Sequence, residues 1–161
     1  MKAKFIYESI RDYLKPKTEE ELSKDLYNLS NDGLNKLLIN CIIDDNNVER
    51  VKLLLKHGAN VNTNDLSRKT PLMWACYKGN IKLIKILLKC GANPNFEDEM
   101  GRTALMITSY NHTLRLPIIL LINAGADINI KDEDGKTALN YAKIRRNKDI
   151  IGLLKSYGAK E

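Results

Sequence analysis

The chain has 161 residues, of which 43% are hydrophobic and 29% charged, a composition typical of a globular domain with room for one core. Its longest apolar run, residues 116–122, is too short to span a membrane, and charged residues interrupt the N-terminal segment where a secretion signal would need an apolar stretch. We therefore expect a cytoplasmic protein without membrane contacts, whose formal net charge of +6 is compatible with an acidic partner.

Residues 1–31 carry two amphipathic helix patterns and no copy of the repeat that follows. The first places apolar residues on one face from Phe5 to Leu14, and Pro16 interrupts it. The second begins at a capping box, Thr18–Glu21, and then places leucines on one face. We expect this segment to be an N-terminal helical cap over the first repeat. The alternative is a docking helix pair, through which the chain would act as a regulatory subunit of a larger complex.

A Gly-Ala pair returns four times in the remainder of the chain, at spacings of 33, 34 and 33 residues; its glycines are Gly58, Gly91, Gly125 and Gly158. Self-similarity at this period indicates a solenoid of stacked repeats. We place the four repeats at about residues 32–64, 65–97, 98–131 and 132–161.

Within each repeat the pattern predicts a turn, a short helix, a tight turn and a longer helix that ends at glycine. Thr70 followed by Pro71 is a helix-start signal, because the hydroxyl accepts an early N–H and proline has no N–H to lose. One equivalent position should cap the second helices; it is occupied by Asn47, Asn80 and Asn147. Every periodic segment is helical, so the predicted fold class is all-α: a solenoid of four helix-turn-helix repeats with an N-terminal helical cap.

These positions resemble the ankyrin repeat in sequence, through the segments Asp65–Ala75, Asp98–Leu105 and Asp132–Ala142 and the Gly-Ala-Asn/Asp-x-Asn endings. Two departures carry structural expectations. Arg68 replaces the turn glycine, which predicts a strained or altered first hairpin. The third repeat has one extra residue before Ile118, so we expect its second helix to be shorter or shifted.

The last repeat carries charge where the earlier repeats are apolar. Lys148 and Lys155 stand at positions that would face a following repeat. A solenoid needs a polar outer face on its terminal repeat, so this repeat is predicted to be the C-terminal cap.

No residue pattern indicates catalysis. The cysteines Cys41, Cys76 and Cys90 lack metal or redox-motif spacing, and neither His57 nor His112 has a partner at relay spacing. We interpret the cysteines as small core residues and His57 as exposed. The glycines are largely used by the repeat turns, which leaves no glycine-rich phosphate loop. We expect no catalytic residue, no metal site and no cofactor, and therefore no enzyme.

Repeat two has a basic stripe, formed by Arg68, Lys69, Lys78, Lys82, Lys85 and Lys89. Three interpretations remain open: a solvated helix face, a surface for an acidic protein, and a nucleic-acid or polyanion site. No aromatic residues alternate with the lysines to stack on bases, which argues against nucleic acid.

The resemblance to ankyrin repeats implies a protein partner bound at the hairpin tips and on the concave face of the first helices. By register, the candidate binding residues are Asp44, Asp45, Leu66, Lys69, Tyr77, Lys78, Met100, Arg102, Tyr110, Asn111, Lys136, Ile144 and Arg145. Stacking should unite Tyr77, Lys78, Tyr110 and Arg145 in one patch, and tyrosine and arginine are enriched at interface hot spots. The expected function is non-catalytic binding of a protein by a rigid surface, with a monomer as the default. The many A/T-coded residues are compatible with a viral or bacterial effector.

Overall fold

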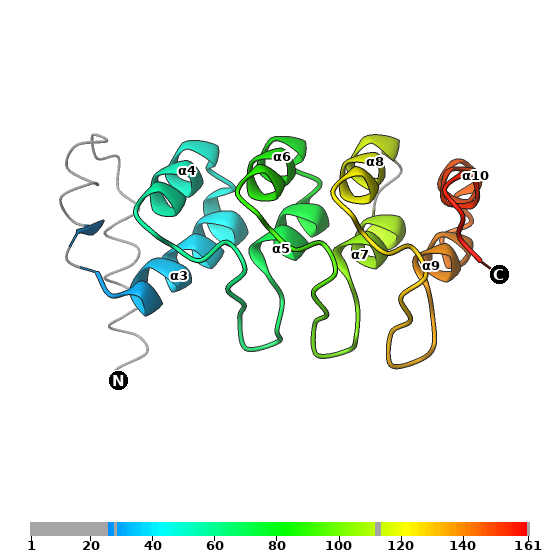
Figure 1. Ribbon diagram of the computed structural model, residues 1–161, viewed down its shortest axis with the longest axis horizontal. Coiled ribbons are helices and arrows are strands. Elements are labelled where there is room, and N and C mark those ends of the chain that lie inside the picture. The colour runs from blue at the N-terminus through cyan, green and yellow to red at the C-terminus, as the bar shows by residue number, and fades with distance from the viewer. Residues whose placement is uncertain (1–25, 28, 112–113, 161) are drawn as a thin grey trace.

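The computed structural model describes residues 26–27, 29–111 and 114–160, which form helices and turns without a strand (Figure 1). The elements are α3 (Asn31–Asn40), the π-helix η1 (Cys41–Asp45), α4 (Val48–Lys56), α5 (Pro71–Lys78), α6 (Ile81–Lys89), α7 (Ala104–Asn111), α8 (Arg115–Asn123), α9 (Ala138–Ile144) and α10 (Lys148–Ser156). The expected all-helical fold class is confirmed in the described part of the chain.

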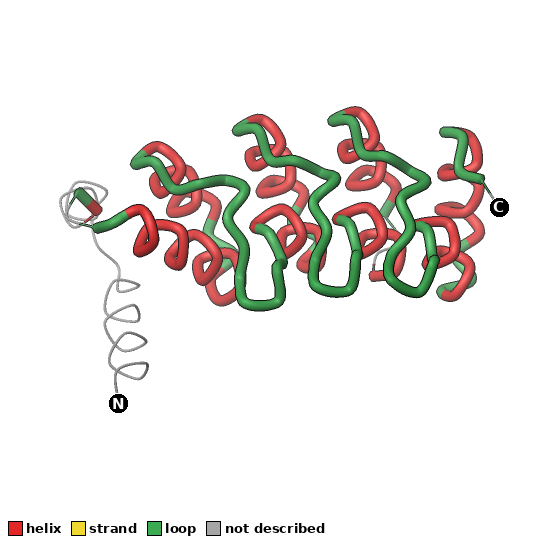
Figure 2. The backbone as a smooth tube through the Cα atoms, turned by 60° about the horizontal axis from the view of Figure 1, so that its bottom comes forward, coloured by secondary structure: helices red, strands yellow, loops and turns green. Residues whose placement is uncertain are grey.

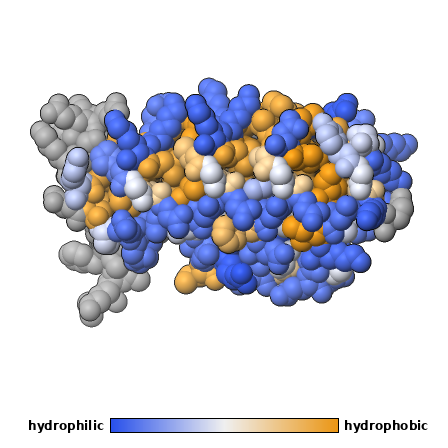
Figure 3. Space-filling view, viewed as in Figure 1, coloured by the Kyte–Doolittle hydropathy of each residue, from blue (hydrophilic) through white to orange (hydrophobic). Residues whose placement is uncertain are grey.

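The helices are arranged as stacked pairs in two layers. The first helices α3, α5, α7 and α9 contact one another in succession, and the second helices α4, α6, α8 and α10 form the other layer (Figure 1). Long loops extend from the helix pairs on one side and carry the hairpins (Figure 2). This is the expected solenoid, and a single core of buried aliphatic residues runs through it from Leu26 to Leu154. Figure 3 shows hydrophobic side chains as a band along the array, with hydrophilic side chains above and below it.

Side chains cap the helices where the sequence predicts caps. Thr70 Oγ1 accepts a hydrogen bond from the N–H of Met73, and Thr137 accepts one from Asn140. At the second helices, each predicted asparagine accepts from an N–H of the first turn; these residues are Asn47, Asn80 and Asn147. Each cap satisfies a helix N–H that has no intrahelical partner, so these capped helices begin at defined residues; α8, which follows Leu114, has no side-chain cap.

The first repeat begins differently. Ser30, not threonine, caps α3, and the helix runs on into the π-turn η1. Asn46 then ends this longer element in the left-handed conformation, with φ of 51°. The second helix of the first repeat therefore matches those of the other repeats, whereas its first helix is longer.

The hairpin at Arg68 is strained but not altered. Arg68 has φ of 58°, against 73° for Gly101 and 76° for Gly135 in the equivalent turns. Its N–H nevertheless donates to the carbonyl of Asp65 at 3.0 Å, as Gly101 N–H does to Asp98. Arginine thus occupies a backbone conformation that favours glycine, while the turn keeps its hydrogen bond.

The expectation of a shorter or shifted second helix in the third repeat is wrong. Helix α8 has nine residues, the same as α4, α6 and α10, and it begins as far before Gly125 as α6 begins before Gly91. Pro117 lies in the first turn of α8, where backbone N–H groups have no intrahelical acceptor and the missing donor is tolerated. The extra residue is absorbed in the connection before the helix.

Asparagine side chains join successive repeats. The Nδ2 group of Asn62 donates to the Gly91 carbonyl at 3.1 Å, and its Oδ1 accepts from the N–H of Asn93 at 2.8 Å. Asn95 and Asn129 repeat both bonds one and two repeats further along. We call Asn62, Asn95 and Asn129 the asparagine ladder. It connects each repeat to the next at the end of the second helix.

The two ends of the solenoid are covered in different ways. The predicted N-terminal helices lie almost wholly outside the described residues; Leu26 is buried in the core, and the Tyr27 ring packs edge-on against His57, 5.7 Å between centroids. At the other end, Lys148 and Lys155 are exposed, as a polar outer face requires.

Candidate functional site

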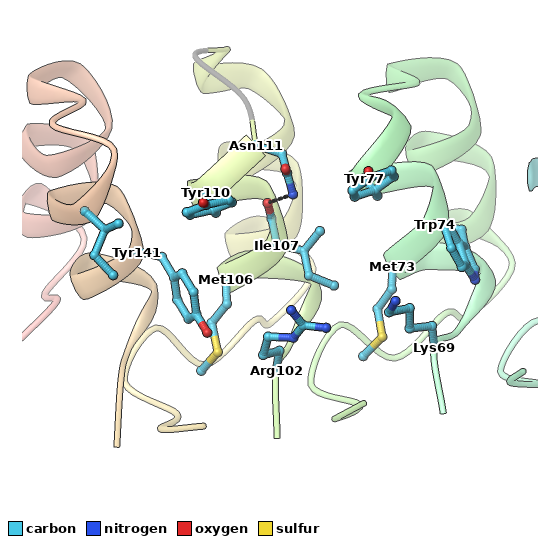
Figure 4. A pocket seen from close by; sticks show the side chains of 11 residues that line it. Lys69, Met73, Trp74, Tyr77, Arg102, Met106, Ile107, Tyr110, Asn111 and Tyr141 are labelled. Atoms are coloured by element: carbon cyan, nitrogen blue, oxygen red, sulfur yellow. Dashed lines mark hydrogen bonds between the residues drawn. The ribbon is translucent and has the colours of Figure 1, made fainter. Parts of the chain in front are cut away.

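A groove of about 540 Å³ lies along the first helices (Figure 4). Its lining side chains come from α5, α7, α9 and the hairpin arms before them, and they are Lys69, Met73, Trp74, Tyr77, Arg102, Met106, Ile107, Tyr110, Asn111, Tyr141 and Ile144. Most are apolar or aromatic, with two cations at the hairpin side. We call this surface the groove.

The hairpin before each first helix is built on an aspartate. One oxygen, Oδ1, of Asp65, Asp98 and Asp132 accepts two backbone N–H groups of its own hairpin, at distances of 2.8–3.1 Å. Hairpins also bond to each other, because the N–H of Glu99 donates to Ser67 and that of Glu133 to Met100, both at 3.1 Å. These bonds hold the hairpin arms at a fixed position beside the groove.

The second oxygen of each aspartate holds a groove side chain. Trp74 Nε1 donates to Asp65 Oδ2 at 2.9 Å, and the Tyr141 hydroxyl donates to Asp132 Oδ2 at 2.6 Å. The equivalent helix position in the third repeat is Ile107, which cannot donate. There Arg102 takes the place of the aromatic donor, with Nε and Nη2 at 2.9 and 2.7 Å from Asp98 Oδ2.

These bonds change the acid–base behaviour of two groove residues. The hydrogen bonds to buried Asp98 raise the pKa of the Arg102 guanidinium, which stays charged. Burial and the hydrogen bond to Asp132 raise the pKa of Tyr141 to about 12. Tyr141 therefore stays protonated and keeps donating across the physiological range.

The aromatic rings are paired edge to face, an exposed tyrosine with a half-buried ring in each pair. Tyr77 packs against Trp74 with 5.8 Å between ring centroids, and Tyr110 packs against Tyr141 at 5.9 Å. Tyr77 is 53% exposed and Tyr110 40%, so both rings present apolar surface to the groove. Edge-to-face packing holds the rings in place while leaving this surface open.

Cations lie over two of these rings. Lys69 Nζ is 5.0 Å from the Trp74 centroid, and the Arg145 guanidinium carbon is 5.1 Å from that of Tyr110. Both distances are within the range of a cation–π attraction. Each of these two rings therefore has a positive charge over its face.

A second hollow of about 500 Å³ continues from the groove at Tyr110 and Asn111. Its other lining residues belong to the turn between α9 and α10 and to the start of α10: Arg145, Arg146, Asn147, Lys148 and Asp149. Three of these five are basic and one is acidic. We call Arg145, Arg146 and Lys148 the cationic end.

A model of the ankyrin-repeat family, built from three copies of the repeat, matches residues 12–98 and again residues 82–161. The two matches together span almost the whole chain. The chain belongs to the ankyrin-repeat family. The family's repeats are protein-interaction modules, and the resemblance drawn from the motifs is confirmed. A comparison with curated proteins finds no match.

The ankyrin stacking brings together about half of the residues predicted for partner binding. Those that line the groove or the hollow beside it are Lys69, Tyr77, Arg102, Tyr110, Asn111, Ile144 and Arg145. Of the predicted patch, Tyr77 and Tyr110 share the groove and Arg145 packs on Tyr110. Lys78 is exposed on the last turn of α5 but does not line the groove.

The other predicted residues lie apart from the groove. Leu66 and Met100 are at the hairpin tips, and Leu66 is fully exposed. Lys136 pairs with Asp134 at 2.7 Å in the last hairpin, and Asp44 is exposed in η1 of the first repeat. For Asp45 only the backbone is described, at the end of η1.

Sequence reasoning missed several lining residues of the ankyrin groove. They are Met73, Trp74, Met106, Ile107 and Tyr141 in the groove, and Arg146, Asn147, Lys148 and Asp149 in the hollow. Trp74, Ile107 and Tyr141 occupy one register position, one helical turn before Tyr77, Tyr110 and Ile144. That spacing of three residues was the available signal, because residues three apart lie on one helix face.

Two of the described histidine and cysteine residues, Cys90 and His57, differ in burial from the sequence expectation. Cys41 and Cys76 are buried, and burial raises the pKa of the Cys76 thiol to about 12; Cys90 is exposed, contrary to the expected core position. His57 is half-buried, not exposed, with Nδ1 2.9 Å from the Leu53 carbonyl. Among the described residues, no group of three metal-binding side chains occurs and no helix is long and apolar enough to cross a membrane.

Proposed function

We propose that this ankyrin-repeat chain is a non-catalytic module that binds a partner protein in the groove along α5, α7 and α9. The observation that carries the proposal is the set of edge-to-face aromatic rings that line the groove beside cations, with Tyr77 and Tyr110 exposed. Tyrosine, tryptophan and arginine dominate the binding energy of protein interfaces. A monomer in the cytoplasm is the corresponding expectation.

The groove is pre-organised for binding. Trp74 and Tyr141 are tied to aspartates that also hold the hairpins, and Arg102 is tied to a third. Side chains that are already fixed lose little conformational entropy when a partner arrives. A rigid surface of this kind favours affinity without any change of fold.

The test is a double substitution of the two exposed tyrosines. Tyr77→Ala with Tyr110→Ala should abolish capture of the native partner in a pull-down from host extract, while the helical circular dichroism signal is kept. The matched control is Lys82→Ala with Lys89→Ala, two exposed residues on α6, which should leave capture intact. Normal capture by the tyrosine variant, with loss of capture on deletion of residues 1–31, would favour the regulatory-subunit alternative.

The nucleic-acid alternative rests on the basic stripe of repeat two, half of which lies on α6, while Lys69 of the same stripe lines the groove. Lys82, Lys85 and Lys89 are exposed on the solvent side of α6, and none of them lines the groove. Binding through these lysines would weaken steeply as salt concentration rises, because counterions are released from the nucleic acid. A gel-shift titration at several salt concentrations should show only weak association; tight, salt-steep association would support this alternative instead.

A further inference from the structure

We infer that the groove recognises a linear acidic segment of its partner, with an apolar side chain among the aromatic rings and carboxylates at the cationic end. This inference rests on the proposed function and deepens it by naming the ligand chemistry. According to this inference, the residues that select an acidic ligand are those of the cationic end, between α9 and α10, and not the basic stripe of repeat two.

The cationic end is not paired with acidic side chains in the described part of the chain. Within residues 26–27, 29–111 and 114–160, Arg145, Arg146 and Lys148 make no salt bridge. Arg102 and Lys136 differ, because Arg102 is bound by Asp98 and Lys136 by Asp134. The single acidic residue that lines the hollow is Asp149. The positive charge in this hollow favours an anionic group of a ligand.

Arg145 connects the cationic end to the aromatic part. Its guanidinium lies over the Tyr110 ring, and Tyr110 and Asn111 line both hollows. A guanidinium that stacks on a ring still presents N–H groups at its edges for a carboxylate. One ligand segment can therefore place an apolar side chain against Tyr110 and a carboxylate against Arg145.

The apolar part of the groove fits an apolar side chain of a ligand. Tyr77 and Ile144 are each more than half exposed, and Met73, Met106 and Ile107 form the buried floor between them. Aspartates are present beside the groove, but both oxygens of Asp65, Asp98 and Asp132 are occupied by hydrogen bonds. The groove therefore combines an apolar site with an excess of positive charge at one end.

The experiment selects ligands from a random-peptide display library against the full-length chain. Trp74 is the only tryptophan and lies in the groove, so its fluorescence reports binding of each selected, tryptophan-free peptide. Selected peptides should be enriched in Asp and Glu beside an aromatic or aliphatic residue. Their Kd should rise about tenfold in Arg145→Gln/Arg146→Gln/Lys148→Gln, the sum of three exposed charge pairs.

The matched control removes the same charge elsewhere, in Lys82→Gln/Lys85→Gln/Lys89→Gln on α6. Its Kd should stay within about twofold of the native value, because these lysines do not line either hollow. Equal weakening in both variants would overturn the inference, since net charge alone would then explain it. Selection without acidic enrichment would overturn it too, as would displacement of the peptides by a single-stranded oligonucleotide at equal charge concentration.

The two proposals fail in different ways. If Tyr77→Ala/Tyr110→Ala abolishes peptide binding but the cationic-end variant binds normally, the groove stands as the binding site and only the acidic preference is wrong. If the acidic peptides bind the tyrosine variant with unchanged Kd, the groove itself is wrong. Circular dichroism of each variant verifies that the repeats remain folded.

Discussion

Loss of Asn95 should uncouple the second and third repeats. Its Nδ2 group donates to the Gly125 carbonyl at 2.9 Å, and its Oδ1 accepts from the N–H of Asp127 at 2.7 Å. Asn95→Ala removes both bonds at once. The two backbone groups of the third repeat then lose their side-chain partner.

The loss of unfolding free energy in Asn95→Ala follows from the number and the geometry of these hydrogen bonds. A typical hydrogen bond contributes a net 0.5–1.5 kcal/mol, so Asn95→Ala should lower the free energy of unfolding by about 1–3 kcal/mol. Asn129→Ala is the matched comparison at the last step of the ladder, where the donor distance to the Gly158 carbonyl is 3.4 Å. Asn129→Ala should lower the free energy of unfolding by about 1 kcal/mol or less, because Asn129 holds only the C-terminal turn.

Urea unfolding followed by two probes measures both effects. Circular dichroism reports all the helices, whereas Trp74 fluorescence reports the second repeat. The native chain should give coincident transitions, and Asn95→Ala should separate them because the repeats on either side unfold less cooperatively. Equal losses for Asn95→Ala and Asn129→Ala, or coincident transitions in Asn95→Ala, would refute the idea that the ladder couples the repeats.

Three further predictions concern packing, strain and titration. Leu87→Ala should lower the free energy of unfolding by about 3–5 kcal/mol and Leu154→Ala by about 2–3 kcal/mol. The difference is expected because α6 packs between α4 and α8, whereas α10 has a repeat on one side only. Equal losses in urea titrations would contradict this prediction. Arg68→Gly should raise the free energy of unfolding by up to about 1 kcal/mol, because it relieves the strain of an arginine at φ of 58°. Gly101→Ala should lower the thermal midpoint, because the new Cβ would lie 3.0 Å from a backbone nitrogen of the next hairpin. Tyr141 should be a late-ionising phenol in an ultraviolet titration, and Tyr141→Phe should remove that step. Because its folded pKa of about 12 exceeds the ordinary value near 10, its contribution to stability is complete below about pH 10 and is lost as pH rises through 12; a curve without a step near pH 12 would contradict this.

Local signals explain why the fold was predictable from the sequence. The caps at Thr70 and Asn80 and the glycine at position 91 each act through hydrogen bonds or backbone conformation within a few residues. The period of the Gly-Ala pairs then fixed how these local units follow one another. The error at α8 has the same origin: an inserted residue is visible in sequence, but whether a turn or a helix absorbs it depends on packing against α6 and α7.

The candidate site was only partly predictable, because the groove forms where three repeats stack and because each repeat folds its hairpin back onto its first helix. The register placed Tyr77 and Tyr110 on one surface, yet nothing local indicates that Trp74 and Tyr141 bind the hairpin aspartates. The third repeat has Ile107 in place of the aromatic donor, and there Arg102 binds the Asp98 carboxylate instead. This replacement is visible only in the folded hairpin, because the carboxylate accepts whichever donor the neighbouring positions supply.

The sequence by itself determined the ankyrin repeat, the order of its helices and most of their starts in repeats two to four, because these depend on short-range hydrogen bonds and on periodic burial. The tertiary structure decided which side chains share the groove and which described charges are paired with each other. The groove depends on distances between atoms in different repeats, which are set only when the repeats stack. The ion pairs at Arg102 and Lys136 depend on how each hairpin folds.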